Sequence, residues 1–274
     1  MPAPTDQKTT RNYTLWFTVP LALLLALVSL AGLLRPEIYR AETADWTVQA
    51  TAQDAIDFFL ILPVLAVSGL YMHRGERRAE PIWGGTVLYL IYTFIIYGFS
   101  VHFNSLFLAY VAILGLSAYA FLYSVRRQLR QPAFQALSSV RPAKAVGIYF
   151  LAVAVLFSLL WLADIVPALV QGITPPSLVA AGLSTNPVHV LDLSVVLPGV
   201  FIVGLLLIRQ HPLGLLFAPV LLVFFVLMDI TITVILAAQP SADGSSPVPV
   251  MVVMTGMALL SLAALGWLIK SGDW

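Results

Sequence analysis

Two short motifs place carboxylate and imidazole side chains one helical turn apart. Asp54 and Asp57 are three residues apart, and His189 and Asp192 repeat this spacing 135 positions later. Residues i and i+3 share a face of an α-helix, so the side chains of each pair are expected to point the same way. Histidine and aspartate bind zinc and similar divalent metals. A histidine next to a carboxylate equally suits general acid–base chemistry.

Further polar side chains are expected at the same depth. His102 and Asn104 lie in a short turn between two apolar runs, and Asp164 lies near the end of a third run. Asp229 is the acid that lies deepest within an apolar run. The candidate ligand-binding residues are Asp54, Asp57, His102, Asn104, Asp164, His189, Asp192 and Asp229. The candidate metal ligands, for a divalent ion such as zinc, are His102, His189, Asp192 and Asp57.

A stripe of hydroxyl side chains follows one apolar run at helical spacing. Its members are Tyr89, Tyr92, Thr93, Tyr97 and Ser100. Such a stripe is typical of hydrogen bonds between membrane helices. It also fits the polar wall of a cavity that leads from the candidate site towards Asp229.

The same residues fit a role without any ligand. Acidic side chains in the first turn of a helix are stabilised by the helix dipole, and Asp54 and Asn186 are of types that cap helices. A histidine in an interfacial turn, such as His102, can simply face water. Three interpretations stay open: helix caps and interfacial residues, a ligand or substrate site without metal, and a metal site.

The composition indicates a membrane protein. Of the 274 residues, 60% are apolar and 10% are charged, and the mean hydropathy is +0.94. A soluble domain has about 25% charged residues. The lipid bilayer is therefore the expected partner, whereas a net charge of +1 gives no reason to expect nucleic acid. The absence of cysteine excludes disulfides, thiolate metal sites and iron–sulfur clusters.

About eight apolar runs have the length of roughly 20 residues that a membrane-spanning helix needs. They are expected at residues 14–34, 55–72, 82–101, 105–124, 145–167, 189–208, 214–236 and 249–269. The first run is longer than the apolar core of a signal peptide, so we expect a membrane helix there. The sequence predicts an all-α, polytopic integral membrane helix bundle, with residues 1–274 forming a single membrane domain.

The basic residues predict the orientation of this bundle. They gather in alternate loops and in both tails, at Lys8, Arg11, Arg74, Arg77, Arg78, Arg126, Arg127, Arg130, Arg141, Lys144, Arg209 and Lys270. The opposite loops hold only Arg35 and Arg40. Because basic loops stay in the cytoplasm, we expect a multi-pass protein of the cell membrane with both termini cytoplasmic. Two long outer loops are expected, at about 35–53 and 168–188.

An internal repeat is expected from the second and sixth runs. Asp57, Pro63 and Gly69 recur as Asp192, Pro198 and Gly204 at the constant offset of 135 residues. The predicted repeat halves are 11–124 and 145–269. Four helices are an even number, so the halves would be parallel repeats related by an axis along the membrane normal.

The predicted function is an outward-facing His/Asp polar site between the segments at 55–72, 82–124 and 189–208. It would bind a metal ion or a small lipid-soluble ligand. Whether it is catalytic stays open, because no side chain stands out as a nucleophile. One alternative is an ion- or proton-coupled transporter that uses the repeat interface, although the inner halves of the runs are almost purely apolar. The other is a structural or assembly subunit of a membrane complex. The sequence leaves the oligomeric state undetermined.

Overall fold

The computed structural model describes residues 4–130, 142–239 and 246–271, and in these ranges the chain is an all-α bundle without strands. Its long helices are α1 (Pro4–Leu34), α2 (Ala44–Ile56), α3 (Leu62–His73), α4 (Ala79–Ser100), α5 (Phe107–Leu129), α7 (Ala143–Gln171), α10 (Leu197–Ile208), α11 (Pro212–Ala238) and α12 (Val248–Ser271). Short elements are η1 (Pro36–Tyr39), η2 (Asp57–Ile61), α8 (Pro176–Ala181), α9 (Pro187–Leu191) and η3 (Asp192–Val196).

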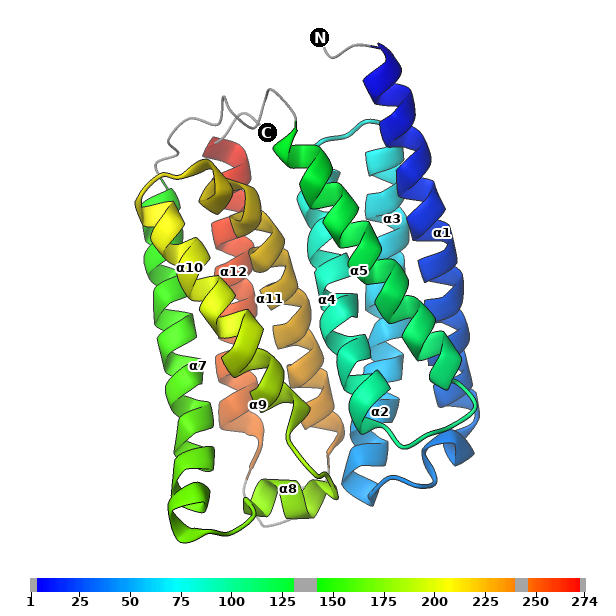
Figure 1. The fold of residues 1–274 in the computed structure, drawn as a ribbon, viewed down its shortest axis with the longest axis vertical. Coiled ribbons are helices and arrows are strands. Elements are labelled where there is room, and N and C mark those ends of the chain that lie inside the picture. Colours follow the sequence, from blue (N-terminus) through cyan, green and yellow to red (C-terminus); the bar gives the residue numbers. More distant parts are fainter. Residues whose placement is uncertain (1–3, 131–141, 240–245, 272–274) are drawn as a thin grey trace.

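Eight spans within these ranges are long and apolar enough to cross a membrane. Six are single helices, while α2–η2–α3 and α9–η3–α10 each form one further span. The predicted fold class, an all-α polytopic membrane bundle, is therefore confirmed. The helix α1 begins and α12 ends at the same end of the bundle, at the top of Figure 1. The opposite end, where α8 lies, is the one that the basic loops predict to face outward, and we call it the outer end.

The predicted loop at 35–53 is wrong in its second part, because α2 starts at Ala44. The Thr43 hydroxyl accepts a hydrogen bond from the backbone N–H of Trp46 at 3.2 Å, which caps the new helix. The second predicted loop, 168–188, is also partly helical. There α7 extends to Gln171. Its C-cap is Gly172, whose φ of 66° suits a residue without Cβ.

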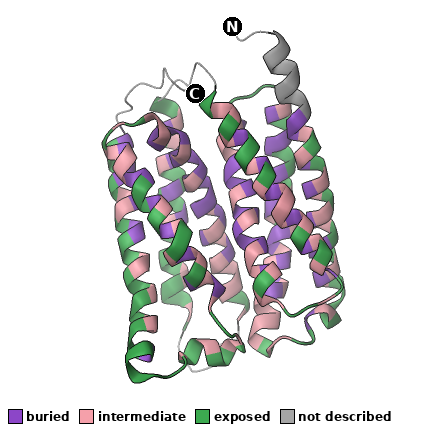
Figure 2. Cartoon of the chain, in the orientation of Figure 1, coloured by how far each residue is buried: buried purple, intermediate pink, exposed green. Residues whose placement is uncertain are grey.

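The helices form two groups of four that follow each other along the chain (Figure 1). The first group contains α1, α2–α3, α4 and α5, and the second contains α7, α9–α10, α11 and α12. The groups meet where α4 packs on α11, where α2 also packs on α11, and where α9 packs on α4. Accordingly, 61% of the α4 span and 50% of the α11 span are buried, against 17% of the α12 span. Figure 2 shows most of the exposed residues on the lateral surface of the bundle.

The two interrupted spans share their internal boundaries. A π-helical turn begins at Asp57 in one and at Asp192 in the other, and a helix of 12 residues follows each turn. In each turn the following leucine N–H, from Leu62 or Leu197, donates to the carbonyl of that aspartate. Proline occupies the next position in both, as Pro63 or Pro198, and has no N–H to donate.

The matched glycines have matched neighbours as well. A Cβ on Gly69 would lie 2.6 Å from the Thr18 side chain on α1, and one on Gly204 would lie 2.9 Å from the Gly147 carbonyl on α7. Each glycine thus lets the preceding span approach closely. These matches are what a duplication predicts. The superposition of residues 11–124 on 145–269 by rotation stays a prediction.

Candidate functional site

Three tyrosines on α4 each donate a hydrogen bond to a different buried aspartate. Tyr89 donates to Asp57 at 3.1 Å and Tyr97 to Asp54 at 3.4 Å, both on the α2–η2 segment. Tyr92 donates to Asp192 on η3 at 3.1 Å. The hydroxyl stripe therefore joins carboxylates from both groups of helices. We call Asp54, Asp57, Asp192 and the three tyrosines the carboxylate–tyrosine layer.

Asp57 lies in a network that reaches from α2 to α11. The Gln53 amide donates to the Asp57 carboxylate at 3.0 Å and to the Tyr89 hydroxyl at 2.6 Å. The Tyr89 and Thr231 hydroxyls are 3.0 Å apart, and Thr231 also donates to the Leu227 carbonyl at 2.8 Å. Among the described residues, the hydrogen-bond partners of this carboxylate, which is 1% exposed, are thus an amide and a hydroxyl group.

Asp192 lies among aromatic rings. Besides the Tyr92 bond, its carboxylate accepts the indole N–H of Trp161 on α7 at 2.8 Å. The Trp161 ring centroid is 4.7 Å from that of His189, and the Tyr92 ring is 5.7 Å from that of Phe224 on α11. Asn186 caps α9 by accepting the backbone N–H groups of Val188 and His189, as the cap interpretation predicted for Asn186.

Asp54 is fully buried inside α2 and is not a helix cap, because the helix begins ten residues earlier than this position. Its carboxylate accepts the Tyr39 hydroxyl at 2.6 Å in addition to the Tyr97 hydroxyl. A Cβ on Gly32 of α1 would lie 1.7 Å from the same carboxylate, so only glycine leaves room there. Burial and the neighbouring Asp54 carboxylate raise the pKa of Tyr39, which keeps the phenol protonated as a donor.

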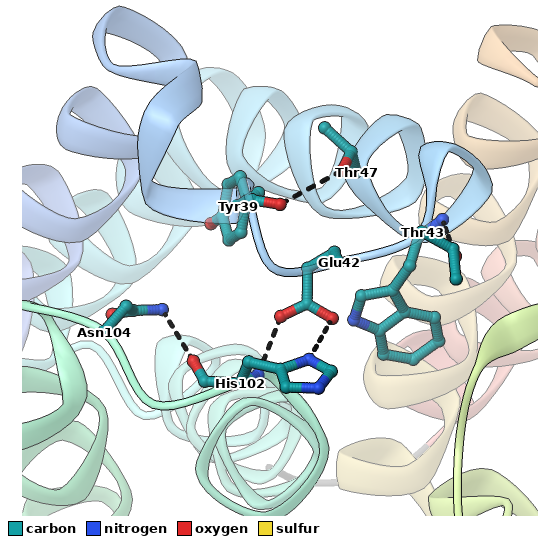
Figure 3. Close-up of polar contacts among 7 residues, drawn as sticks. Tyr39, Glu42, Thr43, Thr47, His102 and Asn104 are labelled. Atoms are coloured by element: carbon teal, nitrogen blue, oxygen red, sulfur yellow. Dashed lines mark hydrogen bonds and ion pairs between the residues drawn. The ribbon is translucent and has the colours of Figure 1, made fainter.

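His102 and Asn104 lie apart from the carboxylate–tyrosine layer, in a group of hydrogen bonds between two loops (Figure 3). The Glu42 carboxylate pairs with His102 Nδ1 at 3.0 Å and accepts its backbone N–H at 2.7 Å. Asn104 donates to the His102 carbonyl at 3.2 Å and accepts the Leu106 N–H at 2.9 Å. The bonds to Glu42 join the η1–α2 loop to the α4–α5 turn, and the His102 side chain itself is exposed.

The structure does not bring the four predicted metal ligands together. No group of three or more His, Cys, Asp or Glu side chains suited to a metal ion occurs among the described residues. Their contacts explain why: His102 binds Glu42, and His189 stacks on Trp161. Asp57 and Asp192 accept from different side chains: Gln53 and Tyr89 in one case, Trp161 and Tyr92 in the other.

The other two candidate acids lie apart from the layer. Asp164 near the end of α7 accepts a hydrogen bond from Ser177 of α8 at 3.0 Å and is partly exposed. Asp229 on α11 is 5% exposed, and its Oδ2 atom has no hydrogen-bond partner among the described residues. Thr231, which contacts Tyr89, is two residues further along α11 and therefore points to a different face of that helix.

Several partners were missed by the sequence reasoning. The candidate acids and His102 are hydrogen-bonded by Gln53, Tyr39, Glu42 and Trp161. The only signal in the sequence for these partners is that their side chains are polar or amphipathic. A further missed cluster lies at the inner end. There Arg127 of α5 pairs with Glu80 of α4 at 2.9 Å and donates to Tyr13 of α1 at 3.2 Å.

No basic side chain of the described ranges pairs with Asp54, Asp57, Asp192 or Asp229. Among the described residues, Asp54, Asp57 and Asp192 accept phenol, amide and indole hydrogens, and the Oδ2 atom of Asp229 has no partner. The layer is thus acidic and buried, and no described residue supplies a countercharge to it. No family model matches the chain, and no curated protein and no solved structure matches it either.

Proposed function

We propose that this chain is a membrane carrier that takes up protons or other small cations from its outer end. The site is the carboxylate–tyrosine layer, with Asp57 and Asp192 as the two exchanging groups. The observation that carries the proposal is that both acids are buried at matched π-helical turns and accept hydrogen bonds from tyrosines of one helix, with no cationic partner in the part of the chain that the structure describes.

The energetics of burial favour a cation or a proton in this layer. A charged side chain at the centre of a membrane helix costs about 2.5–3.5 kcal/mol, and such residues mark ion and proton pathways. Phenol, amide and indole donors stabilise a carboxylate but do not neutralise its charge. Uptake of a proton or a small cation would neutralise it.

The π-helical turns add acceptor groups next to the acids. Leu62 donates to the Asp57 carbonyl rather than to that of Phe58, and Pro63 has no N–H, so the Phe58 carbonyl loses both donors. The same reasoning applies to the Leu193 carbonyl, because Leu197 donates to Asp192. Freed carbonyls at membrane depth are tolerated where they face a cavity or protein, and broken helices in transporters use them to hold ions.

The position of the layer favours transport over a purely structural role. It lies where α4 meets α9, η3 and α11, which is the contact between the two groups of helices. In carriers built from repeats, one half rocks against the other around such a central site. π-Helical turns are frequent at functional sites, and here each one interrupts a spanning helix.

Proton flux into liposomes tests this proposal. The purified chain is reconstituted with a pH-sensitive dye inside, and a potassium diffusion potential drives cations inward. Flux should exceed that of empty liposomes, and Asp57→Asn and Asp192→Asn should each reduce it at least about tenfold, because an amide cannot exchange a proton.

Asp45→Asn is the matched control, because Asp45 lies in the first turn of α2 and is only partly buried. It should leave the flux unchanged. The measurement is repeated for the flux of sodium ions. The proposal fails if neither protons nor sodium ions enter faster than in empty liposomes. Equal flux in all three variants would also contradict it.

A further inference from the structure

The two matched acids have different surroundings, although their helices are alike. Asp57 accepts from the Gln53 amide and the Tyr89 hydroxyl, and Thr231 completes that network. Asp192 accepts from Trp161 and Tyr92, which bring large rings with them. The hydrogen-bond partners of Asp57 are therefore small and polar apart from Tyr89, whereas both partners of Asp192 are aromatic.

The aromatic surroundings of Asp192 come from four separate elements. Trp161 belongs to α7, Tyr92 to α4, His189 to α9 and Phe224 to α11. Trp161 and Tyr92 turn their polar atoms to the carboxylate. The His189 ring lies tilted against Trp161 at 40°, and the Phe224 ring contacts Tyr92 edge-on at 65°, so aromatic surface lies beside both donors of this carboxylate.

This combination selects for a particular kind of cation. Aromatic rings attract cations and are the usual partners of quaternary ammonium groups. An organic ammonium ion with apolar substituents would gain from both the charge and the rings, whereas a hydrated inorganic ion would gain from the charge alone. Tyr89 is the one ring among the hydrogen-bond partners of Asp57, and no aromatic contact of Tyr89 occurs among the described residues, so these surroundings suit a proton.

Resting on the proposed function, we infer that the two acids divide the work: Asp192 binds an organic ammonium ion, and Asp57 binds the proton that is exchanged for it. Each binding event neutralises one carboxylate and leaves the other ionised, so the two acids together carry the same net charge whichever of the two cations is bound. Tyr89 and Tyr92, one turn apart on α4, connect the two sites.

Binding of tetraethylammonium to the purified full chain, measured by titration calorimetry, tests the organic site. Asp192→Asn should weaken binding at least about thirtyfold, because the ion loses its buried charge partner. Trp161→Leu should weaken it roughly threefold to thirtyfold through loss of the ring. Trp161→Phe keeps a ring but loses the N–H donor, so it should bind more tightly than Trp161→Leu.

Asp57→Asn separates this inference from the proposed function. It should bind tetraethylammonium as tightly as the unaltered chain while losing proton flux. If tetraethylammonium fails to bind but both aspartate variants still lose flux, the carrier proposal stands and the organic site is wrong. Equal loss of binding in Asp57→Asn and Asp192→Asn would likewise overturn the division of work. Thermal unfolding of each variant confirms that it is folded.

Discussion

At the scale of single residues, the chemistry of this protein depends on pairing between acids and phenols. The sequence singled out Asp54, Asp57 and Asp192 as candidate site residues, and it singled out the hydroxyl stripe whose tyrosines donate to them in the structure. It could not pair them, because the choice of partner depends on how helices far apart in sequence rotate against each other. His102 shows the limit, since its partner Glu42 comes from a loop 60 positions away.

The space beside Asp54 gives a prediction about stability. Gly32→Ala would place a methyl group 1.7 Å from the Asp54 carboxylate, so the carboxylate must leave its tyrosine partners. We expect a loss of about 1–3 kcal/mol in the free energy of unfolding, measured in detergent. The control is Gly115→Ala on α5, where a Cβ meets nothing within 4 Å. It should gain about 0.5–1 kcal/mol through helix propensity. Equal effects at both positions would contradict the crowding at Asp54.

The inner cluster gives a second prediction about stability. Arg127 joins Glu80 and Tyr13, so Arg127→Ala leaves a largely buried carboxylate without its partner. Because the pair is partly screened by solvent, we expect a loss of about 1–2 kcal/mol in the free energy of unfolding. Arg126→Ala next to it is the control, because Arg126 is exposed. A similar loss in both variants would mean that the pair contributes nothing specific.

At the scale of elements, the spacing of Asp, Pro and Gly carried more information than hydropathy. It matched the second and sixth spans, and the structure gives both a π-helical turn at the same position. Hydropathy alone failed at the outer end, where it predicted a loop over 35–53. The threonine, glutamine and aspartate residues of α2 lower the hydropathy there. Of these, Asp54 is fully buried and Gln53 donates to Tyr89 of α4.

The prolines after the π-helical turns give a prediction about flux. Pro63→Ala and Pro198→Ala restore an N–H, which lets the turn tighten into an ordinary α-helix and rotates the preceding acid away from α4. Both should reduce proton flux without a loss of thermal stability, and to a similar extent if the two spans are duplicates. Pro167→Ala is the control, because this proline lies within α7 where no π-helical turn occurs. Opposite effects of the two substitutions would argue against the duplication.

At the scale of the whole molecule, the sequence predicted eight spans and the structure confirms them. Length and apolar composition suffice for this, because a bilayer leaves few alternatives to the helix. The grouping into two sets of four follows the order of the chain (Figure 1). The contact between the groups, through α4 and α11, could not be predicted, since lipid-facing and helix-facing surfaces are both apolar.

Orientation can be measured cleanly because the chain has no cysteine. Single cysteines at Arg40 and Thr174 should react with a membrane-impermeant maleimide in intact cells, whereas those at Gly75 and Arg209 should react only after permeabilisation. Asp45 is unsuitable as a labelling site, because it lies inside α2. Arg141, one of the basic residues that predict the orientation, lies outside the described residues. Labelling of Gly75 and Arg209 in intact cells would reverse the orientation.

The central claim is that Asp57 and Asp192 exchange protons or small cations with water at the outer end. Infrared difference spectra of the reconstituted protein, recorded across steps of pH and of sodium concentration, test it most directly. We predict a change in carboxyl absorption of which one part is missing in Asp57→Asn and another part in Asp192→Asn, while Asp45→Asn keeps the full signal. Spectra that are identical in the unaltered chain and in both variants would show that these acids exchange nothing, and would contradict the carrier.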